Sequence, residues 1–184
     1  MKRFFTRALC ALGLLLGSLA ATAAPAGAAS ATNTVTVKNV AGGTCLEMPG
    51  WTSEWGAQAT VWGCNGGDNQ NWVFNAMGGG FFQIVNRSSG LCLELPGLPP
   101  STADGTRVQQ WPCNGGRNQL WWFDHWGSGS GDGSRTAEIK NAYAGCLEIN
   151  GWQSGTWGTG AQLWSCNGGA NQRWAFPYEF IYNH

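Results

Sequence analysis

The sequence predicts an all-β fold in which three copies of one unit share a single core. The string C-N-G-G-x-N-Q-x-W occurs three times, beginning at Cys64, Cys113 and Cys166. Around these strings the apolar residues form short alternating runs bounded by Gly, Asn and Pro, and no helical periodicity is sustained, which is typical of strands and turns. One copy is too small to bury its own apolar face, so we expect the three copies to pack together.

The chain begins with a segment typical of a secretory signal peptide. Three basic residues precede an apolar run over residues 8–20, and small residues with A-x-A cleavage motifs follow, one of which ends at Ala28. We expect a cleaved signal peptide over residues 1–28 and an exported domain over residues 29–184. The Ala-rich signal is typical of bacteria. No later apolar stretch is long enough to span a bilayer, so the mature protein is expected to be soluble and extracellular, without membrane insertion.

The charge and Trp content of the exported part indicate which kinds of ligand it can bind. It contains seven basic and ten acidic residues, which give a net charge of about −3. Such a chain has no basic field to hold phosphates, so we expect no nucleic-acid partner. The chain contains twelve Trp, and either a Trp-rich core or a surface that stacks on a ligand must account for them.

Each copy is expected to hold four short strands. The copies cover about residues 33–77, 81–124 and 135–178. Their opening strands are expected at residues 34–37, 82–85 and 136–140. A turn that starts at a shared Asn leads into the C-L-E strand; the three turns begin at Asn39, Asn86 and Asn141. A Gly-containing loop leads to the W-x-C strand, and N-G-G makes a tight turn with positive φ before the closing Q-x-W strand. The Gly/Ser/Asp composition of residues 127–134 predicts a flexible loop between the second and third copies.

Six cysteines remain if Cys10 leaves with the signal, two in each copy and 19, 21 and 20 positions apart. The repeat favours pairing within each copy: Cys45 with Cys64, Cys92 with Cys113, and Cys146 with Cys166. An exported protein can form such disulfides, each worth roughly 3 kcal/mol at this loop length. The alternative is a zinc site, but the sequence lacks C-x-x-C spacing and contains only two His. We therefore expect neither a metal nor another cofactor.

The repeated C-L-E-x, W-x-C and N-Q-x-W elements resemble those of the ricin-B-type lectin family, also called family 13 carbohydrate-binding modules. The resemblance covers essentially the whole exported part and implies a β-trefoil of three pseudo-symmetric four-stranded repeats, with up to one shallow sugar pocket in each. The family's pocket residues are an acid two positions after the first Cys, an aromatic residue two before the second, a Gln two before that aromatic residue, and the Asn of N-Q-x-W. In this sequence these positions hold Glu47, Trp62 and Asn69; Glu94, Gln109, Trp111 and Asn118; and Glu148, Gln162, Trp164 and Asn171. The first copy has Thr60 in place of the Gln.

The residues themselves support the same kind of site. Side chains two positions apart on a strand share a face, so Glu47 points with Cys45, and Trp62 points with Cys64. A disulfide between the two cysteines would therefore bring the acid and the indole to one patch. A carboxylate, an amide and a flat aromatic ring together can bind the hydroxyls and the C–H face of a sugar.

Structural roles are the alternative for each of these residues. The indoles before the second cysteines could belong to the core, but Gln109 and Gln162 share their strand face, which favours ligand stacking. The other Trp set is expected in the core: Trp72, Trp121 and Trp174. The Asn of N-Q-x-W could stabilise the turn, contact sugar, or do both. The Gln that follows it is expected to tie the turn to the backbone; these residues are Gln70, Gln119 and Gln172.

Two features depart from the family pattern. All three copies carry Glu where the family most often has Asp, which leaves the sugar preference open. The loop after the acid contains extra indoles in two copies, Trp51 and Trp55 in the first and Trp152 and Trp157 in the third. These indoles either widen the platform of the first and third pockets or pack against the long loop.

These features predict a secreted, monomeric, non-catalytic lectin that binds polysaccharides or surface glycans through up to three pockets. The alternative is a β-trefoil protein-interaction module, such as a protease inhibitor or a toxin-associated subunit, with vestigial pockets. Glycoside hydrolysis usually needs two carboxyl groups about 5 to 9.5 Å apart, and each predicted pocket has one. His125 adjoins the predicted loop and no residue is marked as a nucleophile, so we do not expect an enzyme.

Overall fold

The computed structural model describes residues 34–128 and 134–177, apart from the side chains of residues 125, 126 and 128. Contacts divide the chain into two units, residues 1–31 and 32–184, and all described residues belong to the second. The expected signal peptide and its cleavage site lie outside the described residues. No helix in the described ranges has the length and apolarity that a membrane crossing requires.

The described residues form strands joined by turns and 3-10 helices, with no α-helix among them. The fourteen strands of these residues are β1 Thr34–Thr36, β2 Lys38–Asn39, β3 Cys45–Glu47, β4 Thr60–Trp62, β5 Asn71–Gly78, β6 Phe81–Asn86, β7 Cys92–Glu94, β8 Thr106–Arg107, β9 Gln109–Trp111, β10 Trp121–Ser128, β11 Arg135–Asn141, β12 Cys146–Ile149, β13 Ala161–Trp164 and β14 Arg173–Phe176. The 3-10 helices are η1 Pro49–Trp51, η2 Asp68–Gln70, η3 Arg117–Gln119, η4 Gly151–Gln153 and η5 Ala170–Gln172.

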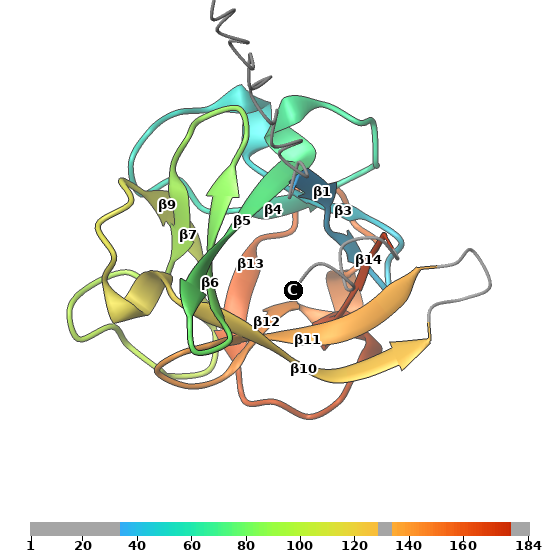
Figure 1. Ribbon diagram of the computed structural model, residues 1–184. Coiled ribbons are helices and arrows are strands. Elements are labelled where there is room, and N and C mark those ends of the chain that lie inside the picture. The colour runs from blue at the N-terminus through green and yellow to red at the C-terminus, as the bar shows by residue number, and fades with distance from the viewer. Residues whose placement is uncertain (1–33, 129–133, 178–184) are drawn as a thin grey trace, which may run out of the picture. The chain divides into compact units, whose positions relative to one another are not determined.

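The first and last strands of each repeat close into a barrel. Hydrogen-bonded neighbours follow the order β1, β5, β6, β10, β11, β14, β2. Only Val37 separates β1 from β2, so these two segments act as one interrupted strand that closes the ring. The long hairpins β5–β6 and β10–β11 form much of the wall (Figure 1).

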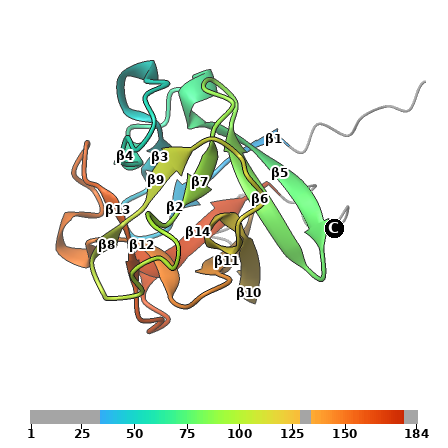
Figure 2. The same cartoon turned by 90° about the vertical axis from the view of Figure 1, so that its left-hand side faces the viewer.

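A short hairpin from each repeat covers one end of the barrel. The hairpins are β3–β4, β7–β9 and β12–β13. Each joins the barrel through its first cysteine, in the pairs Lys38↔Cys45, Val85↔Cys92 and Lys140↔Cys146. Figure 2 shows these hairpins gathered on the side away from the tip of β5–β6. A six-stranded barrel capped by three equivalent hairpins is a β-trefoil, so the expected fold class is confirmed. The fourteen strands of the described residues exceed the twelve expected because β1 and β2 are separate segments and because β8 forms a further short strand.

Tryptophan and phenylalanine fill the core in sets of three. Trp72, Trp121 and Trp174 are fully buried, as expected. Their indole Nε1 groups donate to the carbonyls of Leu46, Leu93 and Leu147 at 3.0, 2.9 and 2.9 Å, so burial leaves no indole N–H unpaired. Two residues further along each closing strand, three Phe rings meet with centroids 5.2 to 6.0 Å apart; they are Phe74, Phe123 and Phe176.

Each repeat carries one of the three disulfides found in the described residues. The bonds join Cys45 to Cys64, Cys92 to Cys113, and Cys146 to Cys166, with a Cα–Cα distance of 5.1 Å in each. The pairing favoured by the repeat is therefore confirmed. Each bond connects the first residue of a capping hairpin to the residue two beyond its last Trp.

The loop expected over residues 127–134 is shorter at its beginning than the composition indicated. Gly127 and Ser128 belong to β10, where they pair with Thr136 and Arg135 of β11. Residues 129–133 lie outside the described residues. Gly and Ser have a weak intrinsic preference for strands. Pairing with β11 nevertheless extends β10 through Gly127 and Ser128.

Candidate functional site

The repeated N-G-G string folds into a turn that its own residues determine. In the first repeat, the backbone N–H of Asn65 donates to Gln70 Oε1, and Asn65 Oδ1 accepts from the N–H of Gly67, both at 2.8 Å. Gly66 has φ of 74°, a conformation that favours Gly. A Cβ on Gly67 would lie 2.6 Å from Asn69 Oδ1, so only Gly fits there. The turn therefore holds the Asn-Gln pair in place.

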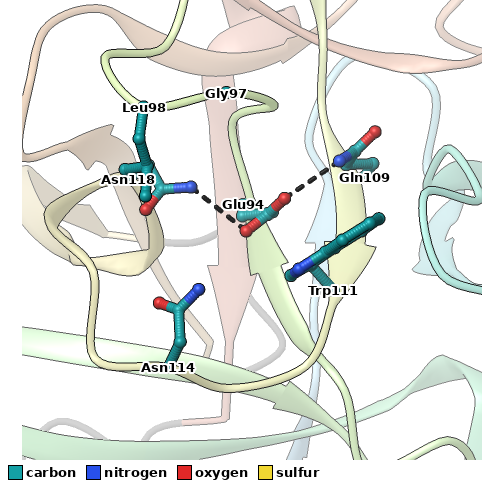
Figure 3. Close-up of a pocket in the computed structure, with 7 residues that line it drawn as sticks. All are labelled: Glu94, Gly97, Leu98, Gln109, Trp111, Asn114 and Asn118. Atoms are coloured by element: carbon teal, nitrogen blue, oxygen red, sulfur yellow. Dashed lines mark hydrogen bonds between the residues drawn. The ribbon is translucent and has the colours of Figure 1, made fainter.

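The same turn delivers two amides to the acid of its repeat. In the second repeat, Asn118 Nδ2 donates to Glu94 Oε2 at 3.1 Å, and Gln119 Nε2 donates to the same oxygen at 3.0 Å. Gln109 Nε2, from the facing strand β9, donates to Glu94 Oε1 at 2.9 Å. Figure 3 shows Asn118 and Gln109 reaching the carboxylate from opposite sides. A carboxylate has about four acceptor positions, so these three donors occupy most of them.

The first and third repeats build the same cluster with one difference. Asn69 and Gln70 donate to Glu47 Oε2 at 3.2 and 3.1 Å. In the third repeat, Asn171 and Gln172 donate to Glu148 Oε2 at 3.1 and 3.0 Å. The Oε1 atoms differ, because Gln162 donates to Glu148 at 2.7 Å whereas Thr60 lies 3.5 Å from Glu47. The first cluster is therefore held less firmly than the other two.

The Gln of N-Q-x-W connects the turn to the acid as well as to the backbone. Gln119 Oε1 accepts from the N–H of Asn114, and its Nε2 donates to the carbonyl of Pro112. These contacts confirm the expected structural role. Its bond to Glu94 was not expected from the sequence, since Glu94 lies on β7 and Gln119 in η3, 25 positions further along the chain.

The indoles before the second cysteines lie outside the core. Trp62, Trp111 and Trp164 are 40%, 37% and 37% exposed, in contrast to the fully buried Trp of the closing strands. Each pairs across its hairpin with the first cysteine of the repeat and therefore stands beside the acid cluster. We call these three residues the platform tryptophans.

A pocket of about 230 Å³ opens beside the platform tryptophan of the second repeat. Trp111 and Gln109 of β9 lie on one side of it, Leu98 and Asn118 on the other, with Glu94 between them (Figure 3). The structure thus brings together all four residues expected for this repeat. The lining also includes Gly97, Leu98 and Asn114, which the sequence reasoning did not place in the site.

Two buried amide oxygens close to the acid clusters lack a partner. Among the described residues, Asn69 Oδ1 and Asn118 Oδ1 accept no hydrogen bond, although both side chains are almost fully buried. A buried acceptor without a donor costs about 1–3 kcal/mol, so such atoms are rare in native proteins. Asn118 lines the pocket, although its Oδ1 is itself shielded from solvent.

The extra indoles do not all lie beside the pocket of their own repeat. Trp51 lies against the turn of its own repeat, since its Cζ2 would be 2.8 Å from a Cβ on Gly67. Trp55 instead contacts Trp111 of the second repeat, and Trp157 contacts Trp62 of the first. Trp152 is 99% exposed.

One group of residues has metal-binding atom types but no free thiols. Ligand atoms of Glu138, Cys146 and Cys166 lie within 4.8 Å of one another. Both sulfurs belong to one disulfide, which does not supply the thiolate that a metal binds.

Comparison with known proteins relates this geometry to carbohydrate-binding domains. The sequence profile described as "Ricin-type beta-trefoil lectin domain" matches residues 33–131, and a "Ricin-type beta-trefoil lectin domain-like" profile matches residues 99–164. Serine protease 1 of Rarobacter faecitabidus is 39% identical over 131 residues, which are 71% of this chain and 21% of the protease. The chain thus spans about a fifth of that relative's length.

Solved structures share the fold. The designed threefold symmetric protein ThreeFoil is 27% identical with a TM-score of 0.69, over 79% of this chain and 98% of its own. An exo-β-1,3-galactanase from Clostridium thermocellum is 31% identical with a TM-score of 0.69, over 79% of this chain and 30% of the galactanase. The ricin B-like lectin of Macrolepiota procera, solved in complex with lactose, is 25% identical with a TM-score of 0.62, over 80% and 96%. This chain belongs to the ricin-type β-trefoil lectin family of carbohydrate-binding domains.

Proposed function

We propose that this protein is a secreted, non-catalytic lectin that binds glycans through a pocket in each repeat. The observation that carries the proposal is the threefold recurrence of an exposed indole beside a buried carboxylate held by amides. An exposed Trp at the same place in all three repeats has no role in the core, and its apolar face suits the C–H face of a sugar ring.

The chemistry of the second pocket supports a sugar as its ligand. Trp111 offers a flat apolar wall, and the polar side chains of Glu94, Gln109, Asn114 and Asn118 line the same pocket. A sugar ring can lie on the indole with its hydroxyls directed at these polar groups. Because three amides already donate to Glu94, the acid acts chiefly by fixing Asn118 and Gln109, and it retains about one acceptor position for the ligand.

Galactose-containing glycans are the first class to test. The Macrolepiota procera lectin was solved with lactose, and the Clostridium thermocellum relative is named as a galactanase. Lactose is therefore the first soluble probe. A Glu in place of the family's usual Asp alters the reach of the acid by one methylene, and competition by a panel of galactosides measures the resulting preference.

The placement of the acids supports binding without catalysis. Glu47, Glu94 and Glu148 belong to three different capping hairpins, and the second pocket is lined by one of them. Hydrolysis of a glycosidic bond usually needs a second carboxyl group within the same cleft. Turnover of a polysaccharide panel, or of peptide substrates, by the purified protein would contradict a purely binding role.

Three pockets on one rigid domain favour multivalent binding. Simultaneous engagement of two or three sites can raise the overall affinity for a repeating glycan by about 10²–10⁴ over a single site. We therefore expect much tighter retention on an immobilised polysaccharide than the affinity for free lactose would give. Size-exclusion chromatography checks that a monomer is responsible.

A glycan array with the exported, oxidised protein tests the proposal. Binding to a defined set of glycans that free lactose competes away is the expected result. Mass spectrometry of protein recovered from culture medium checks export and cleavage after Ala28. Failure to bind any glycan, together with a protein partner recovered from the medium, would favour the protein-interaction alternative.

A further inference from the structure

The loop that follows the acid in each repeat is bonded to the platform strand of the next repeat. The backbone N–H groups of Gly56, Gly105 and Gly158 are equivalent, and each donates to the carbonyl of the residue just before a platform tryptophan. The acceptors are Gln110, Leu163 and Val61, at 2.8, 2.9 and 2.7 Å. The loops therefore follow a cyclic order, from the first repeat to the second, from the second to the third, and from the third to the first.

These glycines bring the loop backbone against the platform rings. Gly56, Gly105 and Gly158 have φ of 80°, 85° and 84°, which favours Gly. A Cβ on each would lie 3.7 to 3.9 Å from Cζ3 of the neighbouring platform indole. The residue that precedes each glycine is consequently placed beside a platform tryptophan of the following repeat.

That preceding residue differs among the three repeats. Trp55 lies beside Trp111, with ring centroids 5.6 Å apart and planes at 57°. Trp157 lies beside Trp62, with centroids 5.1 Å apart and planes at 37°. The third position holds Asp104, whose Oδ1 accepts from the backbone N–H and the hydroxyl of Ser165. Two platforms therefore have an indole from the preceding repeat beside them, and the Trp164 platform has a carboxylate.

The paired indole contacts the platform from outside the pocket. Trp111 lines the second pocket, whereas Trp55 is absent from its lining. Trp157 lies over Gly63 as well as Trp62, because a Cβ on Gly63 would be 2.7 Å from its Cζ2. Trp55 and Trp157 are 65% and 60% exposed, so neither serves to fill the core.

We propose that Trp55 and Trp157 are positioning residues that hold the platform tryptophans of the second and first sugar sites, and that the third site lacks this support. The inference rests on the proposed function. A platform indole already fixed in orientation loses less rotational freedom when a sugar binds, which raises affinity. The second and third sites have the same acid, Gln and Asn, and an aromatic pair contributes enough for the second site to bind about two- to tenfold more tightly than the third.

Variants with one remaining site test this assignment. The double variant Trp62→Ala/Trp164→Ala retains only the second platform, and isothermal titration calorimetry with lactose measures its affinity. Adding Trp55→Ala should weaken lactose binding about two- to tenfold, and Trp55→Phe should recover most of that loss. Trp157→Ala is the matched control in this background, because the partner of Trp157, Trp62, has already been replaced by Ala. We expect Trp157→Ala to change the lactose affinity by less than Trp55→Ala does.

The reciprocal background should exchange the two effects. The double variant Trp111→Ala/Trp164→Ala retains only the first platform. In that background, adding Trp157→Ala should weaken lactose binding, whereas adding Trp55→Ala should not. Circular dichroism supplies a readout independent of the ligand, because two coupled indoles give a paired positive and negative band that each single substitution reduces. Unchanged affinity after Trp55→Ala in the second-site background, or a loss at the first site instead, would overturn the inference alone. Absence of lactose binding by the unsubstituted protein would overturn the proposed function and this inference together.

Discussion

Replacing the exposed and the buried Trp of one repeat by Ala separates binding from folding. Trp111 and Trp121 belong to β9 and β10, two consecutive strands of the second repeat. Their surroundings are opposite, because Trp111 is 37% exposed at the pocket and Trp121 is fully buried. The two substitutions therefore remove equal volume from different environments.

The structure sets the size of the two effects. Trp121→Ala opens a cavity in the core and removes the donor to the Leu93 carbonyl, a bond of 2.9 Å. Large-to-small Trp substitutions in a core cost about 3–5 kcal/mol, so most of the stability of a domain this size is at stake. Trp111→Ala removes a half-buried ring and its contact with Trp55, for which we expect a loss of about 1 kcal/mol.

Urea unfolding and lactose titration measure both effects on the same samples. Trp111→Ala should remain folded and lose one binding site, whereas Trp121→Ala should unfold at much lower urea concentration. Any Trp121→Ala protein that stays folded should keep its pocket residues and bind lactose. Equal destabilisation by the two substitutions, with the number of lactose sites unchanged in Trp111→Ala, would refute the division into platform and core tryptophans.

Two further substitutions test the supports of the site, and a third tests the ion pairs of Lys140 with Asp124 and Glu138. Gln109→Ala leaves Glu94 Oε1 without its amide donor, so unfolding free energy should fall by about 1–3 kcal/mol in urea titrations, and lactose affinity at that site should fall with it. Gly67→Ala places a Cβ 2.6 Å from Asn69 Oδ1, and we expect a lower melting temperature together with weaker binding at the first site only. Burial by itself would lower the pKa of Lys140. Hydrogen bonds to the carboxylates of Asp124 and Glu138, and attraction by their charges, outweigh the effect of burial and raise the pKa above 10.5. The resulting stabilisation of the folded state is present at neutral pH and is lost as pH rises through the raised pKa. The melting temperature of the unsubstituted protein should therefore fall above pH 10, and Lys140→Met should make that fall smaller. An equally large fall in Lys140→Met would contradict this role of Lys140.

Much of the fold could be predicted because the informative signals are local. Alternating apolar residues indicate strands wherever they occur, and the repeated Cys spacing favoured one disulfide pairing, which the structure confirms. The division of Trp into exposed and buried sets also followed from strand alternation. The extension of β10 through Ser128 was not predicted, since a partner strand rather than local preference makes it.

Three of the four residues in the second repeat's acid cluster were predicted for the site, but Gln119 was not, and neither were the hydrogen bonds among them. The sequence placed Glu94, Gln109 and Asn118 in one site, but it described the acid as a direct acceptor for sugar hydroxyls. In the structure, three amides donate to that carboxylate, and the unpartnered acceptor is Asn118 Oδ1. Which acceptor positions of Glu94 are already occupied depends on side chains from β9 and η3, which the fold brings to β7. Residue spacing along the chain does not show these hydrogen bonds.

The sequence by itself determined that three similar units share one all-β core, with an acid, an amide and an indole in each. Only the tertiary structure decided which repeat each loop indole serves. Trp55 and Trp157 stand in the loops of the first and third copies, yet they contact the platforms of the second and first. The physical reason is closure around the threefold axis, which makes each loop a backbone partner of the next repeat's platform strand. Neighbours across a repeat boundary arise from that closure, whereas sequence spacing reports neighbours within one repeat.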